Sequence, residues 1–285
     1  MSDNKNANQT PDTGHSWDDG ALRELLNEPP GWWKLGMWVS LAWVLVYFIL
    51  YPSIPLATDF TKGVMGWTAI KEYKADLKEV EELRAPYEAK IKKMSASAIL
   101  ADSELSSYVE KSGKVLFGDR CAACHGSGGA GNPGFPVLAD DDWLYGGDIN
   151  TIEASITDGR EGGMPAFGGS LSAQQLDDVT QFVIGLAQGT KHAAGAAVFE
   201  EQGCSGCHGE DAKGVTFMGS ANLTDGIYRF TPGTAESVKY TIAHGVNDGS
   251  DPKTRNAVMP SFADKLTETE IKKLAVYVYK LGGGQ

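Results

Sequence analysis

Two copies of one short pattern, Cys-x-x-Cys-His-Gly, constrain this chain more than any other feature of its sequence. The first copy is CAACHG at 121–126 and the second is CSGCHG at 204–209. Together they contain all four cysteines of the 285-residue chain and two of its five histidines. Because every thiol lies in the same pattern, the sequence predicts two equivalent sites, one built on Cys121 and Cys124 and the other on Cys204 and Cys207.

The residues around the two copies are duplicated as well, from about residue 108 to the C-terminus. Each pattern is preceded by a glycine and, four residues after it, a phenylalanine: Gly113 and Phe117, then Gly195 and Phe199. Each is followed by a Met-Pro pair and a phenylalanine: Met164, Pro165 and Phe167, then Met259, Pro260 and Phe262. The repeat predicts two domains of roughly 85 residues each, at 108–190 and 191–285.

Each repeat ends in a segment with apolar residues at helical spacing, which predicts a packing helix. These residues are Leu176, Val179, Val183 and Leu186, then Ile271, Leu274, Val278 and Leu281. Ser172 and Thr267 are the expected N-caps, with Gln175 and Glu270 three residues later as capping-box partners. A domain of this size is small for a self-sufficient core, so a large covalent prosthetic group at its centre would supply apolar volume.

Four chemistries use a Cys-x-x-Cys pair, and the added histidine separates them. A structural disulfide does not need the histidine, and a thioredoxin-like pair belongs to a strand–helix context that is missing here. One tetrathiolate zinc site is disfavoured by the 83 residues that separate the pairs and by the duplicated histidine. Covalent c-type haem uses every residue, since the cysteines form two thioethers and the adjacent imidazole is the proximal iron ligand. The sequence therefore predicts two covalent haems, with His125 and His208 bound to the irons.

The sixth iron ligand separates electron transfer from small-molecule binding, because a thioether opposite the histidine closes the iron and raises its reduction potential. Met164 and Met259 are the expected ligands, since they occupy equivalent turns before a proline in the two copies. A methionine is ordinarily a core filler, but the duplication favours ligation. Met218 is expected to pack at a haem edge. His192 and His244 have no counterpart in the other copy and are not expected to bind iron.

Composition limits the partners and the chemistry. A hydrophobic content of 42% is sufficient for packed cores, and the net charge of −12 argues against nucleic acid and favours a basic partner. Residues 113–198 carry ten acidic and four basic side chains, a net charge of −6. This segment is either a docking surface for a basic donor or a solvated face. The carboxylates show no pairing with a nucleophile, so nothing outside the two patterns predicts catalysis.

One strongly apolar segment lies near the N-terminus, at 31–57, and Leu35 to Tyr51 contains no charge. Its length suits a bilayer span of about 20 residues with aromatic side chains at both interfaces. A cleaved signal peptide would begin nearer the N-terminus and follow a basic region, whereas a stretch of about 30 residues with a net acidic charge precedes this segment. A buried core helix is the other alternative. We expect one uncleaved membrane anchor at 31–56, after an N-terminal tail at 1–30.

Two further helices are expected outside the repeats. Residues 16–33 are compatible with a short helix that Ser16 or Asp18 caps and that the Pro29-Pro30 pair stops. Residues 67–94 are rich in Glu, Lys, Ala and Leu and predict a helix interrupted at Pro86. We expect this second helix to be a solvated part of a spacer at 57–107.

The repeats resemble class I cytochrome c domains, and the whole arrangement resembles the dihaem subunit III (CcoP or FixP) of cbb3-type cytochrome c oxidases. The resemblance extends beyond the haem motifs. It includes TGHSWDD, LNEPPGWW, LYPSIP and GWTAIKEYKADL, which lie between residues 13 and 77. The expected fold class is therefore mainly α, with one N-terminal transmembrane helix followed by two class I cytochrome c domains.

The resemblance implies a non-catalytic relay. Electrons would pass from a donor cytochrome c through the two haems to the monohaem subunit and then to the catalytic haem–copper subunit, which reduces oxygen. It also implies a single-pass protein of the bacterial inner membrane, with a cytoplasmic N-terminus and periplasmic haem domains. Two other readings stay open: a membrane-anchored dihaem acceptor for a periplasmic dehydrogenase, and a dihaem peroxidase with one open iron.

Overall fold

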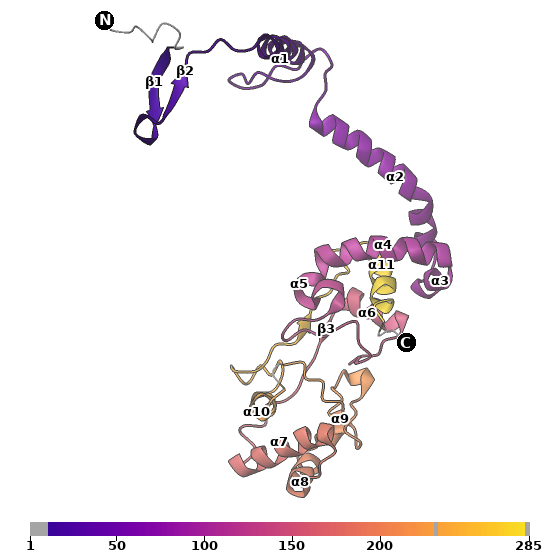
Figure 1. Cartoon of the computed structure of the whole chain (residues 1–285). Helices are drawn as coiled ribbons and strands as arrows, with labels where there is room; N and C mark the ends of the chain where they lie inside the picture. The colour runs from indigo at the N-terminus through magenta and orange to yellow at the C-terminus, as the bar shows by residue number, and fades with distance from the viewer. Residues whose placement is uncertain (1–10, 231–232, 283–285) are drawn as a thin grey trace, which may run out of the picture. The chain divides into compact units, whose positions relative to one another are not determined.

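The computed structural model describes residues 11–230 and 233–282, so the first ten residues of the predicted tail lie outside the described part. The chain forms two compact units, residues 1–83 and 84–285. Helices dominate both units, and the strands form short two-stranded pairs (Figure 1). The predicted mainly α fold class is confirmed.

The N-terminal unit begins with a β-hairpin in place of the helix that we expected at 16–33. Strand β1 (Asp12–Trp17) pairs antiparallel with β2 (Leu22–Leu25), and the short 3-10 helix η1 (Asp18–Gly20) joins them. Asp18 and Asp19 have φ angles of 51° and 53°, in the left-handed region that aspartate tolerates in turns. These angles turn the chain back on itself, so the helix prediction is wrong here.

Helix α1 (Gly31–Leu50) is long and apolar enough to cross a membrane, as the sequence predicted. It has 20 residues, an 18-residue stretch of it has a mean hydropathy of 1.6, and none of its side chains is buried within the protein. At 1.5 Å per residue it extends about 30 Å, the thickness of a hydrocarbon core. The helix ends at Leu50 because Tyr51 is extended and a proline follows it.

Helix α2 (Ala69–Lys93) runs through Pro86 without ending, so the predicted interruption is wrong. Packing beyond the proline explains why the helix continues despite one missing backbone hydrogen bond. Tyr87 stacks on Tyr108 with ring centroids 4.5 Å apart, and Ile91 is completely buried. The last turns of α2 therefore belong to a core and are not a solvated spacer.

The second unit contains the two motifs and is built from two helical cores. Its elements are α3 (Ala96–Ala101), α4 (Ser103–Arg120), α5 (Ala122–His125), η2 (Ser127–Gly129), α6 (Ile149–Asp158), β3 (Arg160–Glu161), α7 (Ala173–Gln188), α8 (Ala193–Glu201), α9 (Ser205–His208), η3 (Thr216–Met218), α10 (Ala235–His244), β4 (Val258–Met259) and α11 (Glu268–Tyr279). We call α3, α4, α6 and α11 the first-motif core, and α7, α8 and α10 the second-motif core.

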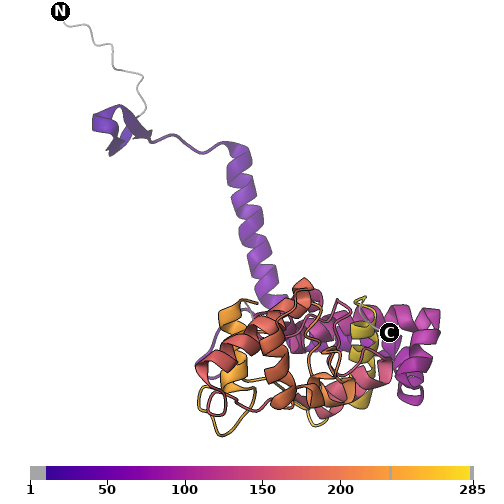
Figure 2. The same ribbon diagram turned by 90° about the horizontal axis from the view of Figure 1, so that it is seen from below.

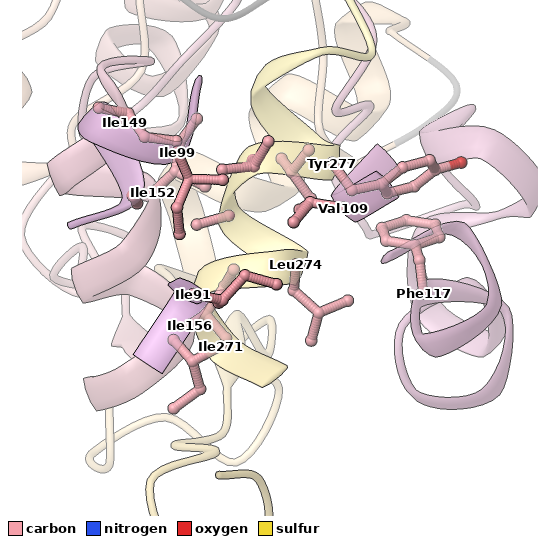
Figure 3. Close-up of a cluster of buried hydrophobic side chains, with 14 of the residues drawn as sticks. Ile91, Ile99, Val109, Phe117, Ile149, Ile152, Ile156, Ile271, Leu274 and Tyr277 are labelled. Atoms are coloured by element: carbon pink, nitrogen blue, oxygen red, sulfur yellow. The ribbon is translucent and has the colours of Figure 1, made fainter. Parts of the chain in front are cut away.

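The first-motif core is the larger of the two. The end of α2 joins α3, α4, α6 and α11 around it (Figures 1 and 3). Its labelled side chains include Ile91, Ile99, Val109, Phe117, Ile152, Leu274 and Tyr277. The second-motif core contains Val179, Val183, Val198, Phe199, Val238 and Ile242. The apolar positions predicted on the two C-terminal helices therefore face the two cores.

Both predicted capping boxes are present and fix where the C-terminal helices begin. The Ser172 hydroxyl accepts from the Gln175 backbone N–H at 3.2 Å, and the Gln175 side chain accepts in return from Ser172. Thr267 and Glu270 make the same reciprocal pair. Each helix therefore starts six residues after the phenylalanine of its Met-Pro-x-Phe segment.

The helices do not pack within the repeat limits that the sequence suggested. We expected α7 to close the first repeat and α11 to close the second. Instead, α11 packs on α4 and α6, while α7 packs on α8 and α10 (Figures 1 and 2). Only residues 189–192 separate α7 from α8, and a connection this short favours packing between the two helices that it joins. The limits 108–190 and 191–285 thus describe the sequence repeat but not the packing.

Candidate functional site

One cavity collects all eight residues that the sequence singled out. Its volume is about 1270 Å³, above the roughly 300–1,000 Å³ of an ordinary single-ligand pocket. The cavity lies within the second unit, and both cores contribute to its wall. The eight residues that line it are Cys121, Cys124, His125, Met164, Cys204, Cys207, His208 and Met259. Their roles as haem and iron ligands remain predictions, but the structure brings them to one place.

The first motif follows directly from the end of α4. Helix α5 is a single turn in which the backbone N–H of His125 donates to the carbonyl of Cys121 at 2.9 Å. The Nδ1–H of His125 donates to the carbonyl oxygen of Pro136 at 3.2 Å. Burial lowers the pKa of His125, although this hydrogen bond opposes the shift. A neutral imidazole with Nδ1 occupied leaves Nε2 as the atom that can bind a metal.

The second motif repeats this geometry on α9. The Nδ1–H of His208 donates to the carbonyl oxygen of Ala221 at 2.9 Å. The end of each motif helix is also fixed by a polar side chain. Asn132 donates to the carbonyl of Cys124 at 2.9 Å, and the Ser220 hydroxyl donates to that of Cys207 at 2.5 Å. Two loops of different sequence therefore orient the two imidazoles in the same way.

The thiols of Cys121 and Cys204 do not have the character of redox nucleophiles, and the four cysteines do not form one shared metal site. All four are free, and burial raises the pKa of Cys121 to about 11 and also raises the pKa of Cys204. Reactive cysteines have lowered pKa values instead. Within residues 11–230 and 233–282, no group of three or more His, Cys, Asp or Glu side chains is placed to hold a metal ion. The two cysteine pairs thus line the same cavity without forming one cluster of metal ligands.

The two methionines occupy equivalent backbone environments. Met164 exchanges two hydrogen bonds with Val246, each 2.9 Å long. Met259 lies in β4, where it pairs with Arg160 of β3. Each methionine carbonyl also contacts the glycine that ends a helix, since a Cβ on Gly159 would lie 2.4 Å from the Met259 oxygen. The matching distance from a Cβ on Gly245 to the Met164 oxygen is 2.3 Å.

The other methionine and histidine candidates lie away from the cavity. Met218 is 43% exposed and is not among the cavity-lining residues, so the expected packing at a haem edge is not seen. His192 is the N-cap of α8, where its Nδ1 accepts from the Gly195 N–H at 3.1 Å. The Nδ1–H of His244 donates to the carboxylate of Asp251 at 2.8 Å. Each of these two histidines therefore has a structural partner.

Four arginines in the cavity wall were not predicted. They are Arg120, Arg160, Arg229 and Arg255. The Nε–H groups of Arg229 and Arg255 are buried without a hydrogen-bond partner. A sequence signal existed for two of the four, because Arg160 and Arg255 each stand four residues before a predicted methionine ligand.

Arg229 also connects the loops that follow the two motifs. Its guanidinium forms a buried ion pair with the carboxylate of Asp142 and donates to the Asp142 backbone oxygen at 2.8 Å. Burial raises the pKa of Asp142, and the charge of Arg229 opposes this shift. Arg255 lies over the rings of Phe230 and Tyr240, at 4.7 and 4.9 Å from their centroids.

These observations fit haem. The cavity offers paired thiols for thioethers, imidazoles with a free Nε2, methionine thioethers and buried arginine N–H groups that carboxylates could accept from. When bound, haem supplies an iron that changes its charge by one electron. The residues around it would anchor the ring, provide axial ligands and neutralise its acidic substituents.

Comparison with known families agrees with this assignment. Residues 109–183 match the family described as cytochrome c oxidase, cbb3-type, subunit III, and residues 192–282 match cytochrome c. Residues 9–58 match the N-terminal domain of cytochrome oxidase-cbb3, FixP. The fold and the site thus define a c-type cytochrome with two cytochrome c domains and one candidate membrane helix.

Relatives along the full chain define the family more closely. The chain is 39% identical to the cbb3-type cytochrome c oxidase subunit FixP of Azorhizobium caulinodans, over 96% of this chain and 93% of the relative. It is 36% identical to the subunit CcoP of Cereibacter sphaeroides, over 97% and 96%. The CcoP subunit of Azospirillum sp. is 39% identical over 96% and 95%. The chain therefore belongs to the FixP/CcoP family of cbb3-type cytochrome c oxidase subunits.

Proposed function

We propose that this chain is a membrane-anchored relay with two covalent haems, one on each motif. It takes electrons from a donor cytochrome c and passes them to the monohaem and catalytic subunits of a cbb3-type oxidase. The single cavity that both motifs line carries this proposal, because it would hold the two haems next to each other. Oxygen reduction takes place in the partner subunit, and this chain has no substrate turnover of its own.

The side chains available as axial ligands support the role of a relay. Each motif has a histidine with Nδ1 bound to a carbonyl oxygen, and the cavity also holds two methionines. Histidine and methionine together saturate a haem iron and raise its potential, which suits electron transfer and disfavours a peroxidase with an open site. Four axial side chains are available for two irons.

The proposed orientation follows from where haem is attached. Helix α1 is the candidate span, and covalent attachment of c-type haem takes place on the periplasmic side of the bacterial inner membrane. The N-terminus is then cytoplasmic and the cavity-bearing unit periplasmic. The acidic segment 113–198 supplies a docking surface for a basic donor.

Oxygen consumption by the purified complex tests this function. In the Cys204→Ser/Cys207→Ser variant the second haem cannot be attached. We expect donor-driven oxygen consumption to fall to background, while a small reductant that reaches the catalytic subunit directly still supports turnover. The corresponding variant of the first motif, Cys121→Ser/Cys124→Ser, should behave in the same way.

Two results would contradict the proposal. Donor-driven turnover that is unchanged in both variants would show that the electrons bypass this chain. A solubilised chain that never copurifies with an oxygen-reducing complex would favour the alternative in which it serves a periplasmic dehydrogenase.

A further inference from the structure

Two apolar side chains project from the loop that follows the second motif. They are Phe217 and Met218 of η3, and we call them the apolar tip. Phe217 is 85% exposed, the largest exposed fraction among the large apolar side chains of residues 11–230 and 233–282. One exposed apolar side chain is ordinary on a protein surface, so the significance of the apolar tip depends on its surroundings.

The apolar tip is held next to an exposed cysteine of the second motif. Cys207 is exposed, and its carbonyl accepts a hydrogen bond from the Ser220 hydroxyl at 2.5 Å. The same hydroxyl accepts from the Val215 N–H at 2.8 Å. η3 ends at Gly219, which lies directly against the ring of Tyr145, so that an added Cβ would meet a ring atom at 2.1 Å. These contacts before and after the apolar tip fix it beside the motif.

The equivalent loop of the first motif directs its phenylalanine differently. Phe135 stands ten residues after His125, and Phe217 stands nine residues after His208. Phe135 lines the cavity, with its ring centroid 6.4 Å from that of His125, whereas Phe217 is not among the cavity-lining residues. Both loops nevertheless orient their histidines in the same way. The outward phenylalanine is therefore a property of the second motif and not of the repeat.

The two motifs also differ in the charge around them. The equivalent segments are 113–138 and 195–223. Segment 113–138 has two basic side chains and one acidic side chain, a net charge of +1. Segment 195–223 has one basic and four acidic side chains, a net charge of −3. The four acidic side chains are exposed and stand before and after the motif in the chain: Glu200, Glu201, Glu210 and Asp211.

Hydrogen bonds hold two of these carboxylates close to the motif. Glu200 accepts from the Ser205 hydroxyl at 3.0 Å, and Asp211 accepts from the Lys213 N–H at 3.2 Å. An apolar centre with a charged rim is the usual anatomy of a protein–protein contact, and an aromatic side chain is the usual anchor at its centre. Because the rim here is acidic, the complementary partner is basic.

We propose that the apolar tip is the contact point for a basic electron-transfer protein that has an apolar rim around its own redox group. On contact, one electron passes from the reduced partner, which is oxidised, to the haem of the second motif, which is reduced. This inference rests on the proposed function, because it names where the donor of that relay docks. The acidic segment 113–198 attracts the donor from a distance, whereas the apolar tip acts only on contact.

Stopped-flow reduction of the detergent-solubilised full-length chain by a basic cytochrome c tests the proposal. Phe217→Ala should lower the second-order rate constant by a factor of roughly ten, since truncating a central aromatic anchor removes a large share of the contact energy. Phe217→Leu should retain most of the rate, because the side chain stays apolar. Val115→Ala is the matched control, since Val115 is 65% exposed on α4 of the first-motif core, and it should leave the rate unchanged.

Three further measurements separate apolar contact from charge and from the haem environment. The ratio of the wild-type rate to the Phe217→Ala rate should persist as salt increases, because salt screens charges but not apolar contacts. Redox titration should give the same potentials for both proteins. In Cys121→Ser/Cys124→Ser, which keeps only the second haem, the sensitivity to Phe217→Ala should remain.

Each measurement has a result that overturns the proposal. An unchanged rate constant in Phe217→Ala, or an equal loss in Val115→Ala, would overturn the docking site, and the proposed function would stand as long as the wild type is reduced rapidly. A ratio that disappears in salt, altered potentials, or a lost sensitivity in the single-haem chain would also overturn it. A wild-type chain with two haems that the donor does not reduce would overturn both the docking site and the proposed function.

Discussion

The backbone of Gly113 on α4 packs directly against the side chain of Tyr277 on α11. A Cβ added to Gly113 would lie 2.8 Å from the Tyr277 Cβ and 2.8 Å from the Lys273 carbonyl oxygen. This contact joins the helix before the first motif to the last helix of the chain. The Tyr277 ring also packs on Phe117, with centroids 5.3 Å apart. Closure of the first-motif core therefore depends on this glycine.

Gly113→Ala should destabilise the protein, because the added methyl group has no room against α11. Overpacking of this kind costs about 1–3 kcal/mol. Gly118→Ala is the matched control, since it lies on the same helix and a Cβ there would meet nothing within 4 Å. Alanine should stabilise that exposed position by up to about 1 kcal/mol. Thermal unfolding of the solubilised full chain, followed by circular dichroism, measures both effects, and equal shifts for the two variants would contradict the account.

Breaking the Asp142–Arg229 ion pair should be costly, because it leaves a buried charge alone. The side chains of both residues are less than 15% exposed, and removing one partner of a buried pair costs roughly 3–5 kcal/mol. We expect Arg229→Ala to lower the free energy of unfolding by an amount in this range. Asp177→Ala, which breaks the more exposed pair with Lys239, should cost less than about 1 kcal/mol. A similar cost for the two variants would show that Arg229 is not effectively buried.

Arg255→Gln should lower the reduction potential of one haem. A nearby positive charge favours the reduced iron, which carries one positive charge fewer, and the Arg255 Nε–H is buried with no protein partner. For a one-electron couple, about 59 mV corresponds to a tenfold change in the equilibrium constant, so redox titration resolves a modest effect. Lys90→Gln, at an exposed position on α2, is the control and should change neither potential. A potential that is unaffected by Arg255→Gln would remove this arginine from the haem environment.

The capping box of α11 should make stability depend on acid pH. Its hydrogen bond from the Thr267 backbone lowers the pKa of Glu270 below its usual value of 4.5. The ionised form is therefore favoured in the folded state, and its stabilisation is present above pH 4.5 and lost as the pH falls through the lowered pKa. Near neutral pH, the free energy of unfolding of the wild type should exceed that of Glu270→Gln by roughly 0.3–1 kcal/mol. This difference should vanish in acid, and a difference that is constant with pH would contradict the role of the charge.

Reduction by a basic donor should slow as salt increases. Segment 113–198 carries a net charge of −6, and salt screens such a surface within about 10 Å at 0.1 M ionic strength. Stopped-flow reduction of the solubilised chain by a basic cytochrome c, measured at increasing salt, tests this. A rate that does not change with ionic strength would assign the acidic residues to ordinary solvation.

Much of the site could be predicted from sequence because its chemistry is local. Each motif lies within one helical turn, and the spacing of its cysteines and histidine by itself predicts covalent haem. The capping boxes and the membrane helix are local features in the same sense. Met164 and Met259, which line the cavity, were singled out because they repeat, and the repeated arginines Arg160 and Arg255 could have been singled out in the same way.

The packing of α11 on the first-motif core and of α7 on the second-motif core could not be predicted. Packing within each repeat and packing across the repeats use the same residue types. Gly113 needs an aromatic partner on a C-terminal helix, and both Phe182 and Tyr277 satisfy this requirement. What decides between them is the connection at 189–192, which is short enough for α7 and α8 to pack on each other. The N-terminal hairpin was missed for a different reason, since the left-handed φ angles of Asp18 and Asp19 overrode a weak helix pattern.

The number and position of covalent haems test the central claim most directly. Purified mature chain is digested and the peptides that carry residues 121–125 and 204–208 are weighed by mass spectrometry, while an alkaline pyridine spectrum gives the ratio of haem to chain. The account predicts two haems per chain, one on each peptide. A single haem, or a peptide with two unmodified thiols at either motif, would contradict it.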